Sequence, residues 1–373
     1  MHFDLSEEQL ALRDAARELL ARRWSPDDAR RAIDAPPASI PEKLWLEVAA
    51  LGWIGIAAPE TEGGSGADVV TAAVLAEEAG RALLPGPFLS AMAAVLAVAR
   101  AGADGALVAE LATGARRATL AFEEPGGGWG PDAVQLRAVP AGDGWSLDGV
   151  KVLVPDAQGV DLVLVAARTR DGGVLVVVPT DAPGVSITPM RRLDAQSVAE
   201  IRFDGVCVPP DARVGEPDPA RSVLTDAYDV WTALLAADLL GTAQRALEMT
   251  VDYAKERWQF GRPIGSFQAV SHRLADVLAA VEIARGLVWG ACLALDDGAP
   301  DAGARVSAAK AWAGDAAVAA TEAAVQLHGG IGYTWELDVH LYLRRARANA
   351  VTLGDADHHR DRLAAHLERE SGW

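Results

Sequence analysis

Hydrophobic positions along this chain change their spacing twice, and each change marks a different kind of structure. From Ser6 to about Gly114, apolar residues recur mostly at three- and four-residue intervals, which predicts amphipathic helices. Ser6 stands three residues before Gln9 and ahead of the first apolar positions, so it is expected to cap the first helix. The first third of the chain is therefore predicted to be a helical bundle.

The middle of the chain has the pattern of a small sheet. From Ala118 onward Val, Ile and Leu alternate with polar residues or form short blocks, which Gly, Pro and Asp separate. Helical spacing returns near Ser222 and continues to the end. The expected strands include 150–154, 160–165, 174–178 and 201–208. We therefore predict a mainly α protein with a β lobe, with helices over residues 1–115, strands over 116–217 and helices again over 218–373.

The composition narrows the possible partners. Half of the 373 residues are hydrophobic and the formal net charge is −18, so the chain can bury a large core but lacks the basic face that nucleic acid or an anionic membrane requires. Cys207 and Cys292 lack CxxC spacing, and the first residues have neither a basic nor an apolar signal region, so a cytoplasmic protein is expected. Apolar stretches such as 91–99 are shorter than the roughly 20 residues that span a bilayer, so no membrane span is predicted.

The histidines do not suggest a metal site. His358 and His359 are adjacent, so on a helix their side chains point apart, and no third ligand has suitable spacing. Both are predicted to be surface residues.

Two glycine-containing motifs stand out in the second helical region. Residues 257–268 read Arg-Trp-Gln-Phe-Gly-Arg-Pro-Ile-Gly-Ser-Phe-Gln, and residues 326–333 read Gln-Leu-His-Gly-Gly-Ile-Gly-Tyr. A guanidinium donates several coplanar N–H bonds and a glycine lets the backbone approach closely, so an arginine followed by Phe-Gly suits a diphosphate. Each motif has an ordinary alternative, because an arginine at a helix end can be solvated and a glycine run can be a simple turn.

Together the two motifs resemble the acyl-CoA dehydrogenase family closely. Segments 121–128, 142–152 and 201–209 also resemble that family's glycine turn, the hairpin that follows it and the strand that leaves its β lobe. The resemblance implies an N-terminal helical bundle, a middle β-barrel or sheet and a C-terminal four-helix bundle. It also implies an FAD cofactor, an acyl-CoA substrate and an electron-transfer flavoprotein or similar acceptor.

In this family the two motifs hold the ADP half of FAD, usually the FAD of a neighbouring subunit. By resemblance, Arg257 and Gln268 contact the diphosphate and Phe260 packs beside the adenine. The resemblance also implies a backbone cradle formed by Gln326, Leu327, His328, Gly329 and Gly330.

The positions that contact the flavin ring differ from the family pattern. Glu123 and Trp129 replace a threonine and a serine of the glycine turn, and Pro155 replaces the hydroxyl-bearing residue near flavin N5. A carboxylate opposes an electron-rich flavin and its phosphates, and a proline offers neither a hydroxyl nor a backbone N–H. Unless the loop alignment slips, three polar contacts are lost on this side.

Neither position that carries the family's base holds an acid. Leu353 precedes Gly354 where most relatives have a glutamate, and Trp231 occupies the alternative base position beside Thr232, which replaces the acyl-site arginine. None of these side chains can take a proton from carbon at a useful rate. Asp229 matches the family's CoA-contacting aspartate, with a solvated helix-cap acid as the alternative. No catalytic residue is therefore assigned in this chain.

These features favour a subunit that lacks its own base. The chain resembles the base-lacking subunits of heteromeric, two-plus-two acyl-CoA dehydrogenases of actinobacterial steroid side-chain degradation. Such a subunit would lend its ADP-binding surface to a partner acyl-CoA dehydrogenase subunit that carries the base. Two alternatives stay open: a homotetramer whose base has moved to Asp229 or Asp355, and a flavin-free CoA-binding pseudoenzyme. On a helix, Asp355 would point away from the side of Leu353.

Overall fold

The structure is a computed structural model that describes residues 5–34, 39–215 and 222–371. The chain forms two compact units, one helical and one built on a sheet. The helical unit comprises Met1–Arg30, Ala73–Leu84 and Thr232–Trp373, and the sheet unit comprises Arg31–Ala72 and Pro85–Trp231. The predicted order of helices, strands and helices is confirmed, while the boundaries at residues 115 and 217 stay a prediction.

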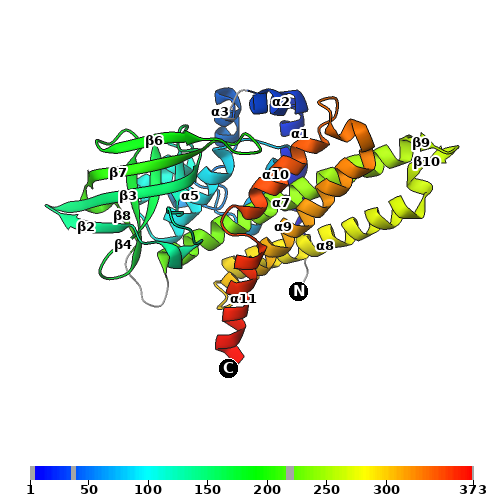
Figure 1. Ribbon diagram of the computed structural model, residues 1–373. Coiled ribbons are helices and arrows are strands. Elements are labelled where there is room, and N and C mark those ends of the chain that lie inside the picture. The colour runs from blue at the N-terminus through cyan, green and yellow to red at the C-terminus, as the bar shows by residue number, and fades with distance from the viewer. Residues whose placement is uncertain (1–4, 35–38, 216–221, 372–373) are drawn as a thin grey trace. The chain divides into compact units, whose positions relative to one another are not determined.

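The helical unit is built around long helices that run alongside one another (Figure 1). Helix α9 packs against α8, α10 and α11, and its buried face is rich in alanine, which permits close approach. The predicted cap is confirmed, because the Gln9 N–H donates to Ser6 Oγ and the Ser6 N–H to Gln9 Oε1. Its helices are α1 (Glu7–Arg23), the start of α2 (Pro26–Asp34), the end of α4 (Val69–Arg81), most of α7 (Val223–Glu256), α8 (Gln268–Asp296), α9 (Ala302–His328), α10 (Val339–Val351) and α11 (Ala356–Ser371).

Helix α8 is long and apolar enough to cross a membrane, which the sequence analysis missed. By length and composition it is the one such helix among the described residues, and core helices of other proteins share these properties. Here α8 lies along α9 and buries Val277, Val281, Val288 and Leu295, while Leu278 and Ile283 of the same helix are exposed, so only part of its apolar surface packs within the bundle.

The sheet unit contains an eight-stranded sheet with the order β6-β7-β3-β2-β4-β5-β8, and β1 pairs with β4 in parallel. Alternate positions of these strands fill its core, including Leu147, Val165, Val176 and Ile201. The strands are β1 (Ala118–Ala121), β2 (Arg137–Ala141), β3 (Gly144–Pro155), β4 (Leu162–Arg168), β5 (Gly173–Pro179), β6 (Val185–Met190), β7 (Val198–Val208) and β8 (Arg213–Val214). Helices α3 (Glu42–Ala50), α5 (Phe88–Arg100) and α6 (Gly105–Ala112) complete this unit, and α5 packs against β1.

A buried carboxylate ties α7 to α10 in the helical unit. Asp238 is fully buried and accepts two bonds from Arg345, at 2.6 and 3.1 Å, and one from Asn349 at 2.6 Å. A buried charge is costly unless it is paired and hydrogen-bonded, and these donors meet that requirement. The pair therefore fixes how α10 lies along α7.

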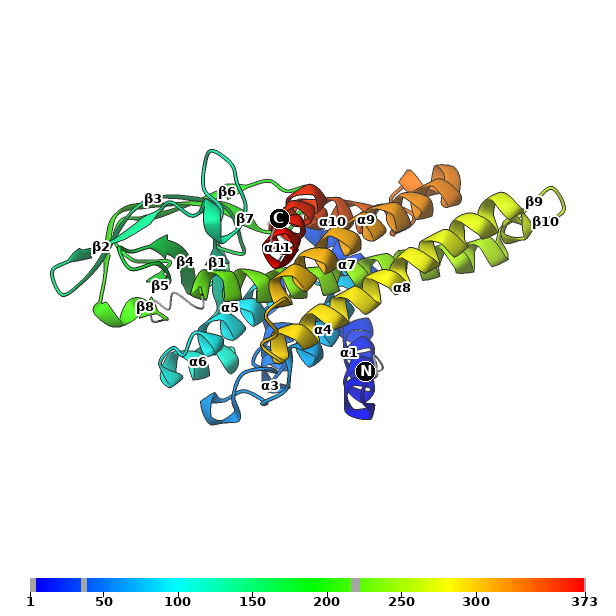
Figure 2. The same ribbon diagram turned by 90° about the horizontal axis from the view of Figure 1, so that it is seen from below.

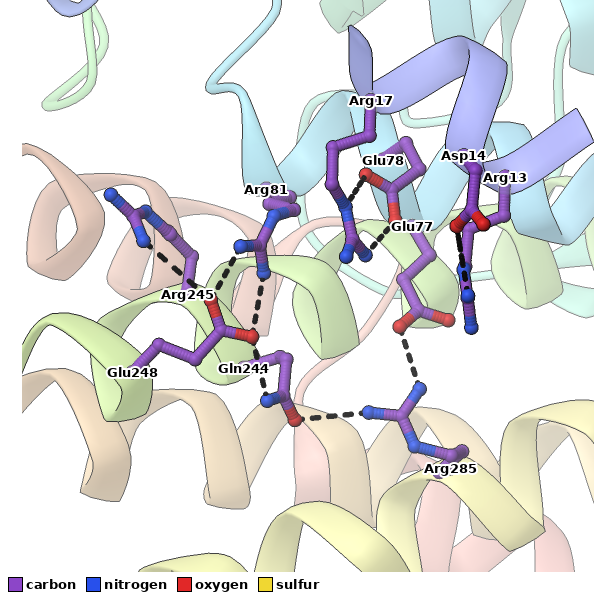
Figure 3. Close-up of polar contacts among 10 residues, drawn as sticks. All are labelled: Arg13, Asp14, Arg17, Glu77, Glu78, Arg81, Gln244, Arg245, Glu248 and Arg285. Carbon is purple, nitrogen blue, oxygen red and sulfur yellow. Dashed lines mark hydrogen bonds and ion pairs between the residues drawn. The ribbon is translucent and has the colours of Figure 1, made fainter. Parts of the chain in front are cut away.

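Arginine–glutamate pairs connect α1, α4, α7 and α8 nearby (Figure 3). Arg17 of α1 binds Glu78 of α4, and Arg285 of α8 binds Glu77 of α4. Burial raises the pKa of the Glu77 carboxyl, and Arg285 opposes that effect. Each pair joins two different helices, so the network specifies their register.

Two glycines allow α4 and α7 to touch through their backbones. A Cβ added to Gly241 would lie 1.8 Å from the carbonyl oxygen of Glu77, and one added to Gly80 would lie 2.0 Å from that of Asp238. No side chain fits at either position without moving a helix.

We predict that Gly241→Ala lowers the free energy of unfolding by about 1–3 kcal/mol, because the new methyl group overpacks the crossing of α4 and α7. Gly286→Ala in α8 is the matched control, since a Cβ there meets nothing within 4 Å and alanine favours helix. Urea unfolding of both variants measures the difference. Equal stability of the two variants would show that the helices can separate without cost.

Candidate active site and cofactor surface

The first motif forms a hairpin between α7 and α8. β9 (Trp258–Gln259) pairs with β10 (Arg262–Pro263), and Figure 2 shows this hairpin at the far end of α7 and α8. Phe260 and Gly261 form its turn with φ of +52° and +79°. A two-residue turn with both φ values positive matches the twist of a hairpin, but it strains a phenylalanine.

The side chains of this hairpin have little to pack against within the chain. Phe260 is 91% exposed and Trp258 is 61% exposed. Arg262 lies 4.0 Å over the ring of Phe267, which steadies the turn from one side. A strained turn that presents aromatic groups to solvent is typical of a surface that binds something outside the chain.

Arg257 and Gln268 flank the hairpin, and both are exposed. Arg257 follows the last residue of α7, and its carbonyl accepts from the Ile264 N–H at 2.8 Å. Gln268 is the first residue of α8, where free N–H groups and the helix dipole favour an anion. The arrangement suits a diphosphate, as the motif predicts.

The second motif ends α9 and lies against the base of the first. His328 stacks on Tyr253 of α7 with ring centroids 4.3 Å apart, and its Nδ1 donates to the carbonyl of Ala324. Burial lowers the pKa of His328, so the ring is neutral and its role here is to pack. Tyr253 precedes Arg257 by four residues, so this stack brings the ends of α7 and α9 together.

The glycines of the second motif leave room for a ligand. A Cβ added to Gly329 or Gly330 would meet no atom within 4 Å, and Gln326 is exposed while Leu327 is half-buried. Tyr333, at the end of the short helix η5 (Gly329–Tyr333), is 74% exposed. The predicted ADP-contacting residues are therefore accessible, except for the buried side chain of His328, and their assignment to FAD stays a prediction.

The first base position, Leu353, is buried inside the helical unit. Leu353 is 1% exposed with φ of +58°, just after α10 ends. Lys310 Nζ donates to the carbonyls of Ala350 and Gly354, at 2.9 and 3.0 Å, and His359 Nε2 donates to the carbonyl of Leu353 at 2.9 Å. This loop is a packed helix end with an apolar side chain at its centre.

Two expectations about this loop are wrong. His359 is fully buried, not on the surface, and burial lowers its pKa to about 2. Residues 352–355 are not helical, so the argument about the direction of Asp355 does not apply. Instead Asp355 Oδ1 accepts from the His358 N–H at 2.9 Å and caps α11, a role that the preference for Asp just before a helix could have indicated.

A groove beside this loop is acidic. It has a volume of about 350 Å³ and lies among α9, α10 and α11. Arg347 pairs with Glu322, and Arg360 pairs with Asp315 and Asp357. Four carboxylates line the groove (Asp315, Glu322, Asp355 and Asp357) against two arginines (Arg347 and Arg360), so its formal charge is −2. Such a groove disfavours a phosphate.

The second base position lies in the sheet unit and is also filled by an apolar group. Trp231 is 3% exposed and packs against Phe122, whose ring also contacts Tyr228. Asp229 is 4% exposed, so it is not a solvated cap residue, and Thr232 on the next turn is fully buried. The aromatic rings occupy space next to the end of β1.

One of the flavin-ring positions, Glu123, lies near a buried lysine in the sheet unit. Lys151 is fully buried, and its Nζ donates to Glu124 Oε1 at 2.7 Å and to the carbonyl of Phe122 at 2.9 Å. Glu124 also accepts from the N–H groups of Gln135 and Leu136. The sequence analysis missed this Lys151–Glu124 pair, which fixes the glycine turn onto β3.

The carboxylate of Glu123 lies near Lys151 and bonds its own backbone N–H. Burial raises the pKa of Glu123 to about 7, although Lys151 opposes the shift. Pro155 ends β3 next to a bulge at which Leu153 has φ of +54° and is half exposed. Proline at 155 offers neither a hydroxyl nor an N–H, and Glu123 loses its only donor when it ionises, so this side fits the flavin ring poorly.

No group of three or more His, Cys, Asp or Glu side chains in the described part of the chain is placed to hold a metal ion.

Family models place the whole chain among known proteins. The acyl-CoA dehydrogenase N-terminal, middle and C-terminal domain models match residues 6–106, 119–206 and 224–368. The chain belongs to the acyl-CoA dehydrogenase family. Its members depend on FAD, so the cofactor of this family member is FAD and its reaction class is oxidoreduction of an acyl-CoA.

Individual relatives cover nearly the full length. The chain is 34% identical to acyl-CoA dehydrogenase IpdE2 of Mycobacterium tuberculosis, over 93% of each chain. It is 35% identical to a solved steroid acyl-CoA dehydrogenase variant, Tcur3481-Tcur3483, with a TM-score of 0.90 and coverage of 98% and 99%. The ChsE4-ChsE5 complex of Mycobacterium tuberculosis also has a TM-score of 0.90, at 29% identity and the same coverage.

We predict that Glu123 makes the stability of this protein depend on pH. Because its pKa is about 7 in the folded chain and near 4.5 when unfolded, its stabilising effect is present below pH 4.5 and lost as the pH rises through 7. Glu123→Gln should therefore be more stable than the parent at pH 8, by on the order of 1–3 kcal/mol, and lose that advantage by pH 5.

Urea unfolding at pH 5, 6, 7 and 8 measures this effect, with the exposed Glu60→Gln in the same unit as control. Stability curves that stay parallel for Glu123→Gln and the parent would mean that this carboxyl titrates normally.

Proposed function

We propose that this chain is the non-catalytic half of a heteromeric acyl-CoA dehydrogenase. It supplies the ADP-binding surface for an FAD whose ring is held by a catalytic partner subunit. The observation that carries the proposal is the contrast between an accessible ADP surface and base positions occupied by buried Leu353 and Trp231.

The ADP side supports a contact between subunits. Arg257, Gln268 and the aromatic tip of the hairpin are exposed, and the N-terminus of α8 faces the same end. A planar guanidinium and a helix N-terminus together favour a diphosphate. Bound FAD would supply hydride acceptance, whereas these residues would only bind and orient its ADP half.

The base side argues against an independent enzyme. Lys310 and His359 hydrogen-bond the carbonyls of the Leu353 loop, and the carboxylate of Asp355 caps α11. The other candidate for a relocated base, Asp229, is buried at one end of α7 next to Tyr228 and Trp231. A general base must be able to reach its proton, so neither acid is well suited.

The substrate class is proposed by similarity. Two similar solved structures are a steroid acyl-CoA dehydrogenase and the ChsE4-ChsE5 complex. We infer a steroid side-chain thioester as the substrate of the complex, a cytoplasmic location, and an electron-transfer flavoprotein or similar acceptor. A flavin-free CoA-binding pseudoenzyme is the alternative, which the buried carboxyl of Glu123 at a flavin-ring position favours.

The test is co-expression with an acyl-CoA dehydrogenase encoded beside this chain's gene. The chain alone should be colourless and inactive, and the purified complex should contain one FAD per pair of chains and reduce it with an acyl-CoA. Flavin absorbance and native mass spectrometry measure both.

A yellow, active homo-oligomer of this chain would overturn the proposal. A stable, colourless homo-oligomer that binds CoA and ignores every neighbouring partner would favour the pseudoenzyme instead.

A further inference from the structure

A second cleft lies in the helical unit, among α1, α2, α4, α7 and α10. Its volume is about 330 Å³, within the range of small-molecule sites. None of the predicted cofactor residues or base positions lines it. Its apolar lining is formed by Leu20, Ala21, Trp24, Pro26, Ala29, Ala82, Leu83, Met249 and Leu341.

The polar lining of this cleft is dominated by arginine. Arg17, Arg81 and Arg245 line it together with Glu78 and Asp338. Glu78 is held by Arg17 at 2.6 Å, and Asp338 is held by Arg30 at 2.7 Å. Both lining carboxylates are therefore already neutralised by an arginine.

Arg245 is the least completely paired of these cations. Arg81 binds both oxygens of Glu248 and Gln244 donates to the same carboxylate at 2.9 Å, while Arg245 reaches it only at 3.6 Å (Figure 3). Burial acts to raise the pKa of Glu248, but its bonds from Arg81 and Gln244 keep it below the ordinary value. The carboxylate is thus charged and saturated. Arg245 also bonds the phenol of Tyr342, and its remaining guanidinium donors are left for another oxyanion.

A second, independent feature of the cleft points to a bound acceptor. Trp24 is 5% exposed, and its Nε1–H is buried without a hydrogen-bond partner. An unpaired buried donor typically costs about 1–3 kcal/mol. Tyr342 also lines the cleft, but it does not serve as an anionic acceptor for this N–H. Burial raises the pKa of its phenol to about 12, and its O–H donates to the carbonyl of Arg81.

We propose that this cleft binds a small carboxylic acid with an apolar body, such as a medium-chain fatty acid. The carboxylate would accept from Arg245 and from the indole N–H of Trp24, and the apolar body would lie against Leu20, Met249 and Leu341. The cleft is too small for a nucleotide cofactor with its acyl chain, and it does not depend on the proposed division of labour between subunits.

The test uses octanoate, with 1-octanol as the uncharged control and acetate as the control without an apolar body. Calorimetric titration of the full chain at pH 7.5 should give an octanoate dissociation constant of roughly 10–1,000 µM and no measurable binding of acetate. Octanol should bind at least about 10-fold more weakly than octanoate.

Variants locate the site. Arg245→Gln should weaken octanoate binding by about 10- to 100-fold, and Trp24→Phe by about 3- to 10-fold. Arg202→Gln, an exposed arginine of β7 in the sheet unit, is the matched control and should leave binding unchanged. Circular dichroism checks that each variant is folded. If Arg245→Gln does not fold, the octanoate affinity of Trp24→Phe tests the site instead.

Three results would overturn the proposal: no octanoate binding up to millimolar concentration, equal binding of octanol and octanoate, or variants that bind as tightly as Arg202→Gln. Release of octanoate on adding the partner subunit would show instead that the partner occupies the cleft, which also contradicts it.

Discussion

The buried carboxylate of Asp238 is the contact on which the helical unit depends. It joins α7 to α10 through Arg345 and Asn349, and removing one partner of such a pair typically costs about 3–5 kcal/mol. Helix α7 leads at its end to the hairpin with Arg257, and α10 ends just before Leu353. The same packing therefore sets the position of the proposed ADP surface and of the loop that would carry a base.

The hairpin and the Leu353 loop differ physically, although the same packed helices position both. The hairpin keeps a strained turn at Phe260 and exposes its aromatic groups, which costs stability and is understandable if another molecule covers them. The base loop does the opposite: Leu353 is buried, and Lys310 saturates the carbonyls around it. The surface proposed to meet a partner is thus exposed, whereas the position of the family's base is part of the core.

The sequence predicted the order of helices and strands and the cap at Ser6, because periodicity and capping chemistry are local. It did not predict the buried Lys151–Glu124 pair, the burial of His359 or the cap at Asp355. The lysine pair and the buried histidine depend on segments that meet only after folding. The long apolar helix α8 was also missed. Small and charged residues interrupt its apolar positions, so its apolar character emerges only as an average over the helix.

The affinity of the assembled complex for FAD tests the central claim most directly. If Arg257 of this chain holds the diphosphate, Arg257→Ala should raise the FAD dissociation constant by about 10- to 150-fold, and Arg257→Lys should recover only part of it because an ammonium cannot reproduce the planar fork. Arg202→Ala should change nothing. Unchanged FAD affinity in both Arg257 variants would contradict the assignment of this surface to the cofactor.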